Sequence, residues 1–319
     1  VVATLLRIHG LGWGLPALYD PDEPIFVLTA LKLLNERTLN PAWFGHPGTT
    51  TIYSLAVIYA LLFGVGQLTG RFADGNAFAQ AIYLDPGIVI LPGRIFMLLC
   101  ALAAIALTFL VARRLFGTAT GLVAAALLAI DPIHIKYSQI IRTDMHASVF
   151  MLLAVYAAIG IVRRGRLRDY LLTGLWIGFA CATKWPAATA TAAMIGASVA
   201  RMARHPDERW RQAGFALLSV AVSAVALFIA SPYLLLDHAT VAANLLGEAR
   251  PSHLGSTGSG PVGNAIWYLA NPFRAAIGSL GIVLAVVGTV LAIRRSRAFL
   301  ATVVPVFAVF FAAVCMQAL

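Results

Sequence analysis

The chain has 319 residues, of which 60% are hydrophobic and 11% charged, and its mean hydropathy is +0.85. This composition excludes a soluble globular domain, and the long apolar runs predict a protein that crosses a membrane several times. The formal net charge of +10 does not indicate a nucleic-acid partner, because the basic residues lie in short clusters between apolar runs. We therefore expect lipid headgroups to be their neighbours. Since the sequence begins at the tail of one apolar run and stops within another, we also expect truncation at both ends.

The first charged stretch, YDPDEPIFV at residues 19–27, packs three carboxylates into four positions. Asp22 is a natural helix N-cap, and Glu23 is a favourable charge for a first helical turn. The residues that follow predict an amphipathic helix that is too short and too charged to span, and that lies in the membrane interface. Its expected apolar side consists of Val27, Ala30, Leu31 and Leu34. At this point the carboxylates are explained equally well as caps or as part of a site.

Four clusters of basic residues predict the topology. They are Arg113 and Arg114; Arg163, Arg164, Arg166 and Arg168; Arg201, Arg204, Arg209 and Arg211; and Arg294, Arg295 and Arg297. The positive-inside rule assigns them to the cytoplasmic side. The expected spans are then residues 94–112, 116–133, 147–162, a hairpin over 170–200 that turns near Lys184, 213–232, 273–293 and 299–319. Segments 17–93 and 233–272 are expected on the outer side, the first with interfacial helices.

The apolar run Thr49–Leu68 does not fit this topology as a simple span. If the segment before it is external, a single crossing here would leave the next span starting on the wrong side. The run is either an interfacial or re-entrant helix, or it pairs with a short return through Ile88–Pro92. We favour the first interpretation.

The second external segment, DPIHIKYSQIIRTDMHAS from Asp131 to Ser148, is rich in ionisable side chains. Asp144 immediately precedes the next span, so it is held at the membrane surface, where it can serve as a helix cap. Ionisable residues at this depth are costly, however, and usually mark a site. Interleaved carboxylates and cations on one face suit a phosphorylated lipid. Lys184 lies in an otherwise apolar hairpin. It is either a ligand for such a phosphate or a lysine whose side chain snorkels to the interface.

Several pieces of the sequence resemble one family in their order along the chain. They are DE at Asp22 and Glu23, FGHPGTTTIY from Phe44, PGRIFMLLCALAAIALTFLVARRLFG from Pro92, RTD ending at Asp144, and ATKWP around Lys184. Together they are similar to the GT-C fold membrane glycosyltransferases, in particular the glycosyltransferase family 39-like proteins that include protein O-mannosyltransferases and aminoarabinose lipid A transferases. The similarity covers residues 1 to about 200. His46 is followed by Pro47 and Gly48, whereas the family has two prolines.

The resemblance implies an all-α transmembrane helix bundle of the GT-C type, formed by residues 1–319 as a single module in the bacterial plasma membrane. It also implies an inverting transfer of a sugar from a polyprenyl phosphate to an acceptor hydroxyl of a protein, lipid or glycan on the outer, periplasmic face. Such a transfer needs a base near the acceptor and positive charge near the leaving phosphate. Asp22 is the expected base, and Glu23 and Asp144 would orient the acceptor or hold a divalent cation. The sequence does not demonstrate a metal; Asp22 and Asp144 would be its ligands.

The donor phosphate is expected to bind Arg142, Lys184 and His46. The competing function is a transporter of polyprenyl lipid or solute, since intramembrane charges also line translocation paths. Against it, the charges gather on one face and no inverted repeat is visible. A third hypothesis is that the protein binds the polyprenyl phosphate without turnover.

Overall fold

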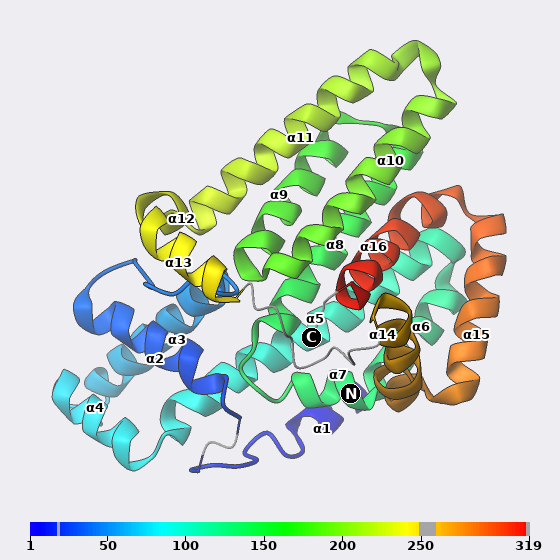
Figure 1. The fold of residues 1–319 in the computed structure, drawn as a ribbon. Helices are drawn as coiled ribbons and strands as arrows, with labels where there is room; N and C mark the ends of the chain where they lie inside the picture. Colours follow the sequence, from blue (N-terminus) through cyan, green and yellow to red (C-terminus); the bar gives the residue numbers. More distant parts are fainter. Residues whose placement is uncertain (18–19, 249–259, 317–319) are drawn as a thin grey trace.

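The computed structural model describes residues 1–17, 20–248 and 260–316, and within these ranges the protein is helical and contains no β-strand (Figure 1). The central bundle is formed by five long helices, which are α5 (Gly87–Phe116), α8 (Thr143–Arg164), α9 (Leu167–Thr183), α10 (Thr191–Arg204) and α11 (Arg209–Ala230). The predicted all-α class is confirmed.

Within the described residues, six helical segments are long and apolar enough to cross a membrane. They are Thr49–Leu68, Gly87–Phe116, Thr143–Arg164, Pro206–Ala230, Gly260–Arg295 and Arg297–Cys315. A seventh would be the pair α6 (Thr118–Ile130) and α7 (Pro132–Tyr137), which is bent by 64°. The chain is thus a polytopic membrane protein, as its composition predicts.

The helix expected over residues 116–133 is shorter than predicted. α6 ends at Ile130, and Asp131 caps the next helix by accepting a hydrogen bond from the His134 backbone N–H at 2.7 Å. Pro132 has no N–H to donate to α6 and suits the first position of a new helix. The 13 residues of α6 span only about 20 Å, so the break at Asp131 divides the apolar run into two short helices.

The predicted turn at Lys184 is confirmed. α9 ends at Thr183, the 3₁₀ helix η1 occupies Trp185–Ala190, and α10 follows. The two arms do not pair closely, because α9 packs mainly against α11 and α8, while α10 packs against α16 (Arg297–Cys315) and α8. The approach of α9 to α11 requires glycine: a Cβ at Gly174 would lie 2.2 Å from the Ser219 carbonyl oxygen.

Three helices form a separate layer beside one end of the bundle, at the lower left of Figure 1: α2 (Glu23–Glu36), α3 (Thr49–Leu68) and α4 (Gly75–Leu84). The predicted helix after Asp22 is confirmed, but its apolar face is turned from the predicted one. The buried apolar residues are Phe26, Val27, Ala30 and Leu33, whereas Leu34 is 39% exposed.

α3 packs within this layer. Its buried residues share a core with α2, with Phe72 and Phe78, and with Val89 and Ile90 in the first turn of α5, and Leu55 also faces Gly93 in the second turn. A helix running alongside α5 through the membrane would also contact the middle of α5, so this packing favours the interfacial arrangement. The alternative return through Ile88–Pro92 is wrong, because these residues begin α5 and continue into its 30-residue helix.

The remaining helices complete the fold. They are α1 (Val2–Ile8), the 3₁₀ helix η2 (Pro206–Glu208), α12 (Tyr233–Leu236), α13 (His238–Glu248), α14 (Gly260–Tyr268), the π-helical η3 (Leu269–Phe273) and α15 (Arg274–Arg295).

The loop before α3 is held by the segment around α13, because Asn40 donates to Asp237 at 2.8 Å and the Phe44 N–H donates to Asn244 at 2.7 Å. Residues 249–259 of the expected external segment 233–272 lie outside the described residues.

Candidate active site

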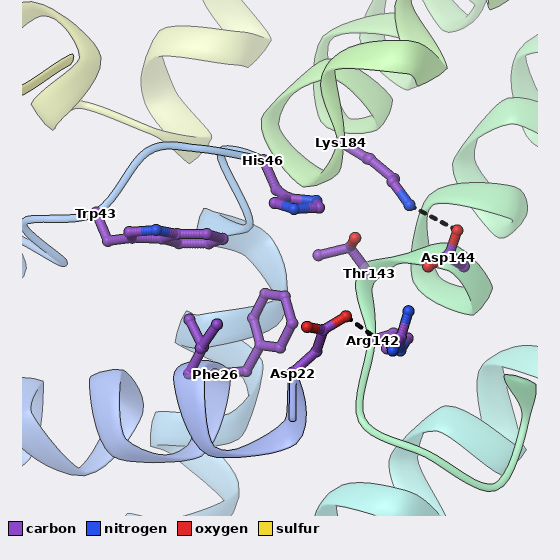
Figure 2. Close-up of a pocket in the computed structure, with 9 residues that line it drawn as sticks. Asp22, Phe26, Trp43, His46, Arg142, Thr143, Asp144 and Lys184 are labelled. Atoms are coloured by element: carbon purple, nitrogen blue, oxygen red, sulfur yellow. Dashed lines mark hydrogen bonds and ion pairs between the residues drawn. The ribbon is translucent and has the colours of Figure 1, made fainter. Parts of the chain in front are cut away.

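A cavity opens where the α2–α4 layer meets the bundle (Figure 2). Four stretches of chain line it: the start of α2, the loop before α3, the segment that enters α8, and the residue that follows α9. The lining residues are Asp22, Ile25, Phe26, Trp43, His46, Arg142, Thr143, Asp144 and Lys184. The structure therefore brings together five of the six predicted site residues, all but Glu23.

Backbone hydrogen bonds join the loop before α3 to the turn after α9. The Trp185 N–H donates to the His46 carbonyl at 2.7 Å, and the Gly48 N–H donates to the Thr183 carbonyl at 3.2 Å. Pro47 and Lys184 thus form an antiparallel bridge. This pairing explains why His46 and Lys184, which are far apart in sequence, line one cavity.

Two carboxylate–cation pairs form the polar wall of the cavity (Figure 2). Arg142 Nη2 lies 2.8 Å from Asp22 Oδ2, and Lys184 Nζ lies 2.6 Å from Asp144 Oδ1. The carboxylates are 42% and 36% exposed, and the cations 26% and 23%. Because pairs this exposed contribute little net stability, an anionic ligand can compete for either cation at low cost.

Arg142 is held as a cation by a second carboxylate. Its Nη2 lies 3.2 Å from Asp20 Oδ2. Burial alone would lower the pKa of Arg142, but the charges of Asp20 and Asp22 and the hydrogen bond to Asp20 outweigh it and raise the pKa. Arg142 is therefore a fixed positive charge in this cavity.

The capping explanation does not account for either cavity carboxylate. Asp22 is the N-cap residue of α2, yet its side chain makes no capping hydrogen bond and instead pairs with Arg142. The N-cap of α8 is Arg142, and Asp144 lies inside the first turn, paired with Lys184. The expectation that Asp144 could cap α8 is wrong, because the helix begins one residue before it.

Glu23 points away from the cavity, into the protein. Its side chain is fully buried and binds Arg94 through two hydrogen bonds, from Nε at 2.8 Å and from Nη2 at 2.6 Å. It also accepts from the Ile141 N–H at 2.9 Å. Arg94 in turn donates to the carbonyls of Leu11 and Trp13 at 2.8 and 2.7 Å. Glu23 therefore fixes the residues next to it and next to Ile141, which are Asp22 and Arg142.

An aromatic wall faces the ion pairs. His46 stacks on Trp43, with ring centroids 5.4 Å apart and planes inclined by 23°. Phe26 meets Trp43 edge-on at 5.7 Å and His46 at 6.4 Å. The predicted phosphate ligand His46 is thus part of an aromatic, stacked surface on the side of the cavity opposite Arg142 (Figure 2).

Several residues that contribute to the cavity were not predicted from the sequence. Trp43, Phe26 and Thr143 follow no pattern that marks a cavity. Arg94 could have been identified from the sequence, because it is the one charged residue in the apolar run 87–112. A charge in such a run usually has a dedicated partner.

The described residues do not form a metal site on their own. Within residues 1–17, 20–248 and 260–316, no group of three or more histidine, cysteine, aspartate and glutamate side chains could hold a metal ion. The two proposed ligands Asp22 and Asp144 are each neutralised by a cation.

The cavity is small, with a volume of about 50 Å³. This accommodates a few water molecules, whereas sites for drug-sized ligands enclose roughly 300 to 1,000 Å³. A sugar phosphate can enter only if the ion pairs separate or the rim residues move.

A family model matches the middle of the chain. The family model described as dolichyl-phosphate-mannose-protein mannosyltransferase matches residues 78–235, about half of the chain. No curated protein matches, and no solved structure matches. The matched segment contains Arg142, Asp144 and Lys184, and it begins after Asp22 and His46.

Proposed function

The chain belongs to the GT-C type, family 39-like membrane glycosyltransferases, and from this premise we propose that it transfers a sugar from a polyprenyl-phosphate donor to an acceptor hydroxyl with inversion. The reaction takes place in the cavity between Asp22, Arg142, Asp144 and Lys184, on the outer face of the membrane. The observation that carries the proposal is the arrangement of two exposed carboxylate–cation pairs beside an aromatic wall, in an integral membrane protein of this family.

The donor phosphate binds by replacing carboxylates. Lys184 and Arg142 each hold one carboxylate now, and a phosphate entering between the two cations takes over these charge-assisted contacts. Asp22 and Asp144 are then released toward the incoming acceptor. The same exchange makes room in a cavity that is otherwise too small for the donor. The cations also stabilise the negative charge that develops on the leaving phosphate.

The transfer exchanges one C–O bond for another. The bond between the anomeric carbon and the phosphate oxygen breaks, and its electron pair leaves with the polyprenyl phosphate. The acceptor oxygen forms the new bond from the opposite face of the sugar, and its proton passes to the Asp22 carboxylate. Asp144 accepts a hydrogen bond from the acceptor and orients it.

The family and the membrane location support the choice of donor and acceptor classes. The matched family is named for a dolichyl-phosphate-mannose donor and a protein acceptor. For this chain we propose a polyprenyl-phosphate sugar as donor and a protein, lipid or glycan hydroxyl as acceptor. Mass analysis of the lipid that copurifies with the protein tests the donor class: a polyprenyl phosphate or its glycoside supports it, and ordinary membrane lipids alone count against it.

Replacing Lys184 with glutamine should weaken donor binding about 10- to 100-fold, because a charge-assisted contact to phosphate is lost. Lys184→Arg keeps the charge and should bind within a few-fold of wild type. The measurement is titration of the purified protein with a polyprenyl-phosphate mannose, followed by native mass spectrometry. Lys136→Gln is the control, since Lys136 is exposed at the same end of the bundle and does not line the cavity. Equal donor affinity in wild type, Lys184→Gln and Lys184→Arg would show that Lys184 does not bind the donor phosphate and only snorkels to the interface.

The proposed orientation predicts which positions an impermeant reagent reaches in intact cells. In a chain whose three cysteines are replaced, single cysteines at Lys136 and His238 should react with an impermeant maleimide from outside. Cysteines at Arg204 and Arg294 should react only after permeabilisation. All four positions are exposed, so failure to react reports the side of the membrane and not burial. Reaction of the Arg204→Cys variant in intact cells would reverse the orientation.

A further inference from the structure

A second, larger cavity of about 460 Å³ lies between α5, α8 and α9. Five arginines line it, together with a single carboxylate: Arg113, Arg114, Arg164, Arg166, Arg168 and Asp169. Five guanidinium groups against one carboxylate leave a net four positive charges.

This cavity lies at the opposite end of the bundle from the candidate active site. Asp144 and Arg164 lie in the first and last turns of α8, and at 1.5 Å per residue they are about 30 Å apart along the axis. α9 likewise runs from Leu167 at the arginine cavity to Thr183, next to Lys184. About 30 Å is the thickness of the hydrocarbon core of a bilayer, so the two cavities lie near its two surfaces.

Most of the positive charge is not neutralised by the protein. In the described part of the chain, Arg164 is the one arginine of the five with a carboxylate at ion-pair distance, namely Asp169. Arg114 donates to the Tyr156 carbonyl at 2.8 Å and lies over the Tyr156 ring. Arg113, Arg166 and Arg168 are exposed at the mouth of the cavity. Like charges gathered in this way favour a bound anion.

The deeper wall of the cavity is apolar. On α9, Leu172 and Trp176 follow Arg168 at intervals of four residues, so the three side chains line one face of the helix. Leu153 on α8 and Leu110 on α5 complete the apolar part. From Arg168 to Trp176 the cavity wall extends about 12 Å along the helix, away from the charged end. A free phosphate would use only the mouth, whereas an acyl chain would cover the rest.

We propose that this cavity binds an anionic phospholipid, with the headgroup phosphate on Arg113, Arg166 and Arg168 and an acyl chain along Leu172 and Trp176. Charge at the mouth and apolar surface within match the two parts of such a lipid. The site is separate from the proposed transfer reaction, and its occupancy does not depend on that reaction.

The test is fluorescence quenching of the full chain in neutral detergent by dioleoyl phosphatidylglycerol brominated in its acyl chains. Bromine quenches tryptophan on contact, so a seated chain should quench Trp176. The component specific to the anionic lipid should disappear in Trp176→Phe, and brominated phosphatidylcholine should not reproduce it. Each arginine at the mouth is expected to contribute about fivefold in affinity, so the double variant Arg113→Gln, Arg168→Gln should bind about 25-fold more weakly.

The matched control is the double variant Arg204→Gln, Arg294→Gln, which removes the same charge from exposed arginines that do not line the cavity. It should bind within twofold of wild type. An equal loss in both double variants would overturn the proposal in favour of general surface attraction. Full displacement of the lipid by equimolar glycerol phosphate would identify a soluble phosphate site instead. Retained anionic quenching in Trp176→Phe would show that the lipid binds elsewhere.

Discussion

Asp22→Asn should reduce sugar transfer about 10²- to 10⁴-fold and leave the melting temperature near that of wild type. The loss is expected because an amide cannot take the acceptor proton, and removing a general base typically has this effect on the rate. Stability should be retained because the Asp22 side chain makes no capping hydrogen bond and its pair with Arg142 is exposed. Asp144→Asn should lose transfer in the same way, since it shares the cavity.

A matched control separates catalysis from capping. Asp74 is the N-cap of α4, lies outside the cavity and does accept a hydrogen bond from the Ala77 N–H at 2.8 Å. Asp74→Ala should lower stability by about 1 kcal/mol, as for other lost caps, without slowing transfer. The measurements are thermal unfolding and initial rates on the purified variants. Wild-type transfer rates in Asp22→Asn would show that Asp22 is not the general base and only marks the start of α2.

Glu23→Ala should destabilise the protein by about 3 to 5 kcal/mol, because it leaves the buried Arg94 charge without its partner. It should also slow transfer, since Glu23 fixes the positions of Asp22 and Arg142 through its own backbone and through Ile141. The double variant Glu23→Gln, Arg94→Gln removes both charges and should regain part of the stability. Thermal unfolding of the purified variants measures these differences.

Glu36→Ala in the same helix is the control. Glu36 pairs with Lys32 at 4.0 Å on an exposed surface, where such pairs contribute about 0.5 kcal/mol or less. Unfolding of Glu23→Ala at the wild-type temperature would contradict the positioning role of Glu23.

Hydropathy and basic clusters predicted most of the helices, because a bilayer requires long apolar helices and the arginines mark where they end. The turn at Lys184 was predictable, since Pro186 cannot continue α9. The break between α6 and α7 was not predicted, although Asp131 is a good N-cap and Pro132 suits the first position of α7. Their signal lies inside an apolar run whose length alone suggests a single span.

The side chains of the site were predicted better than their pairing. Asp22, Arg142, Asp144, Lys184 and His46 do line one cavity, but which carboxylate meets which cation depends on how the α2–α4 layer docks on the bundle. Sequence order carries no information about that docking.

Glu23 is a different case, because the helical pattern could have identified it as buried. Glu23, Phe26, Val27 and Ala30 follow the spacing i, i+3, i+4, i+7 of a single helix face. The predicted face of Val27, Ala30, Leu31 and Leu34 also passes through Glu23, four residues before Val27, but Glu23 was interpreted as a first-turn charge or a site residue. A carboxylate on the apolar face indicates a buried partner, which is Arg94 here.

The most direct test of the account is stoichiometric turnover. Purified protein is incubated with a panel of polyprenyl-phosphate hexoses and pentoses and a detergent extract of the host's envelope proteins and glycolipids as acceptors. Wild type is expected to release one polyprenyl phosphate for each sugar transferred and to form a product with the opposite anomeric configuration from the donor. Asp22→Asn is expected to release almost none. Donor that is bound but returned intact across the whole panel, or release that is equal in wild type and Asp22→Asn, would contradict it.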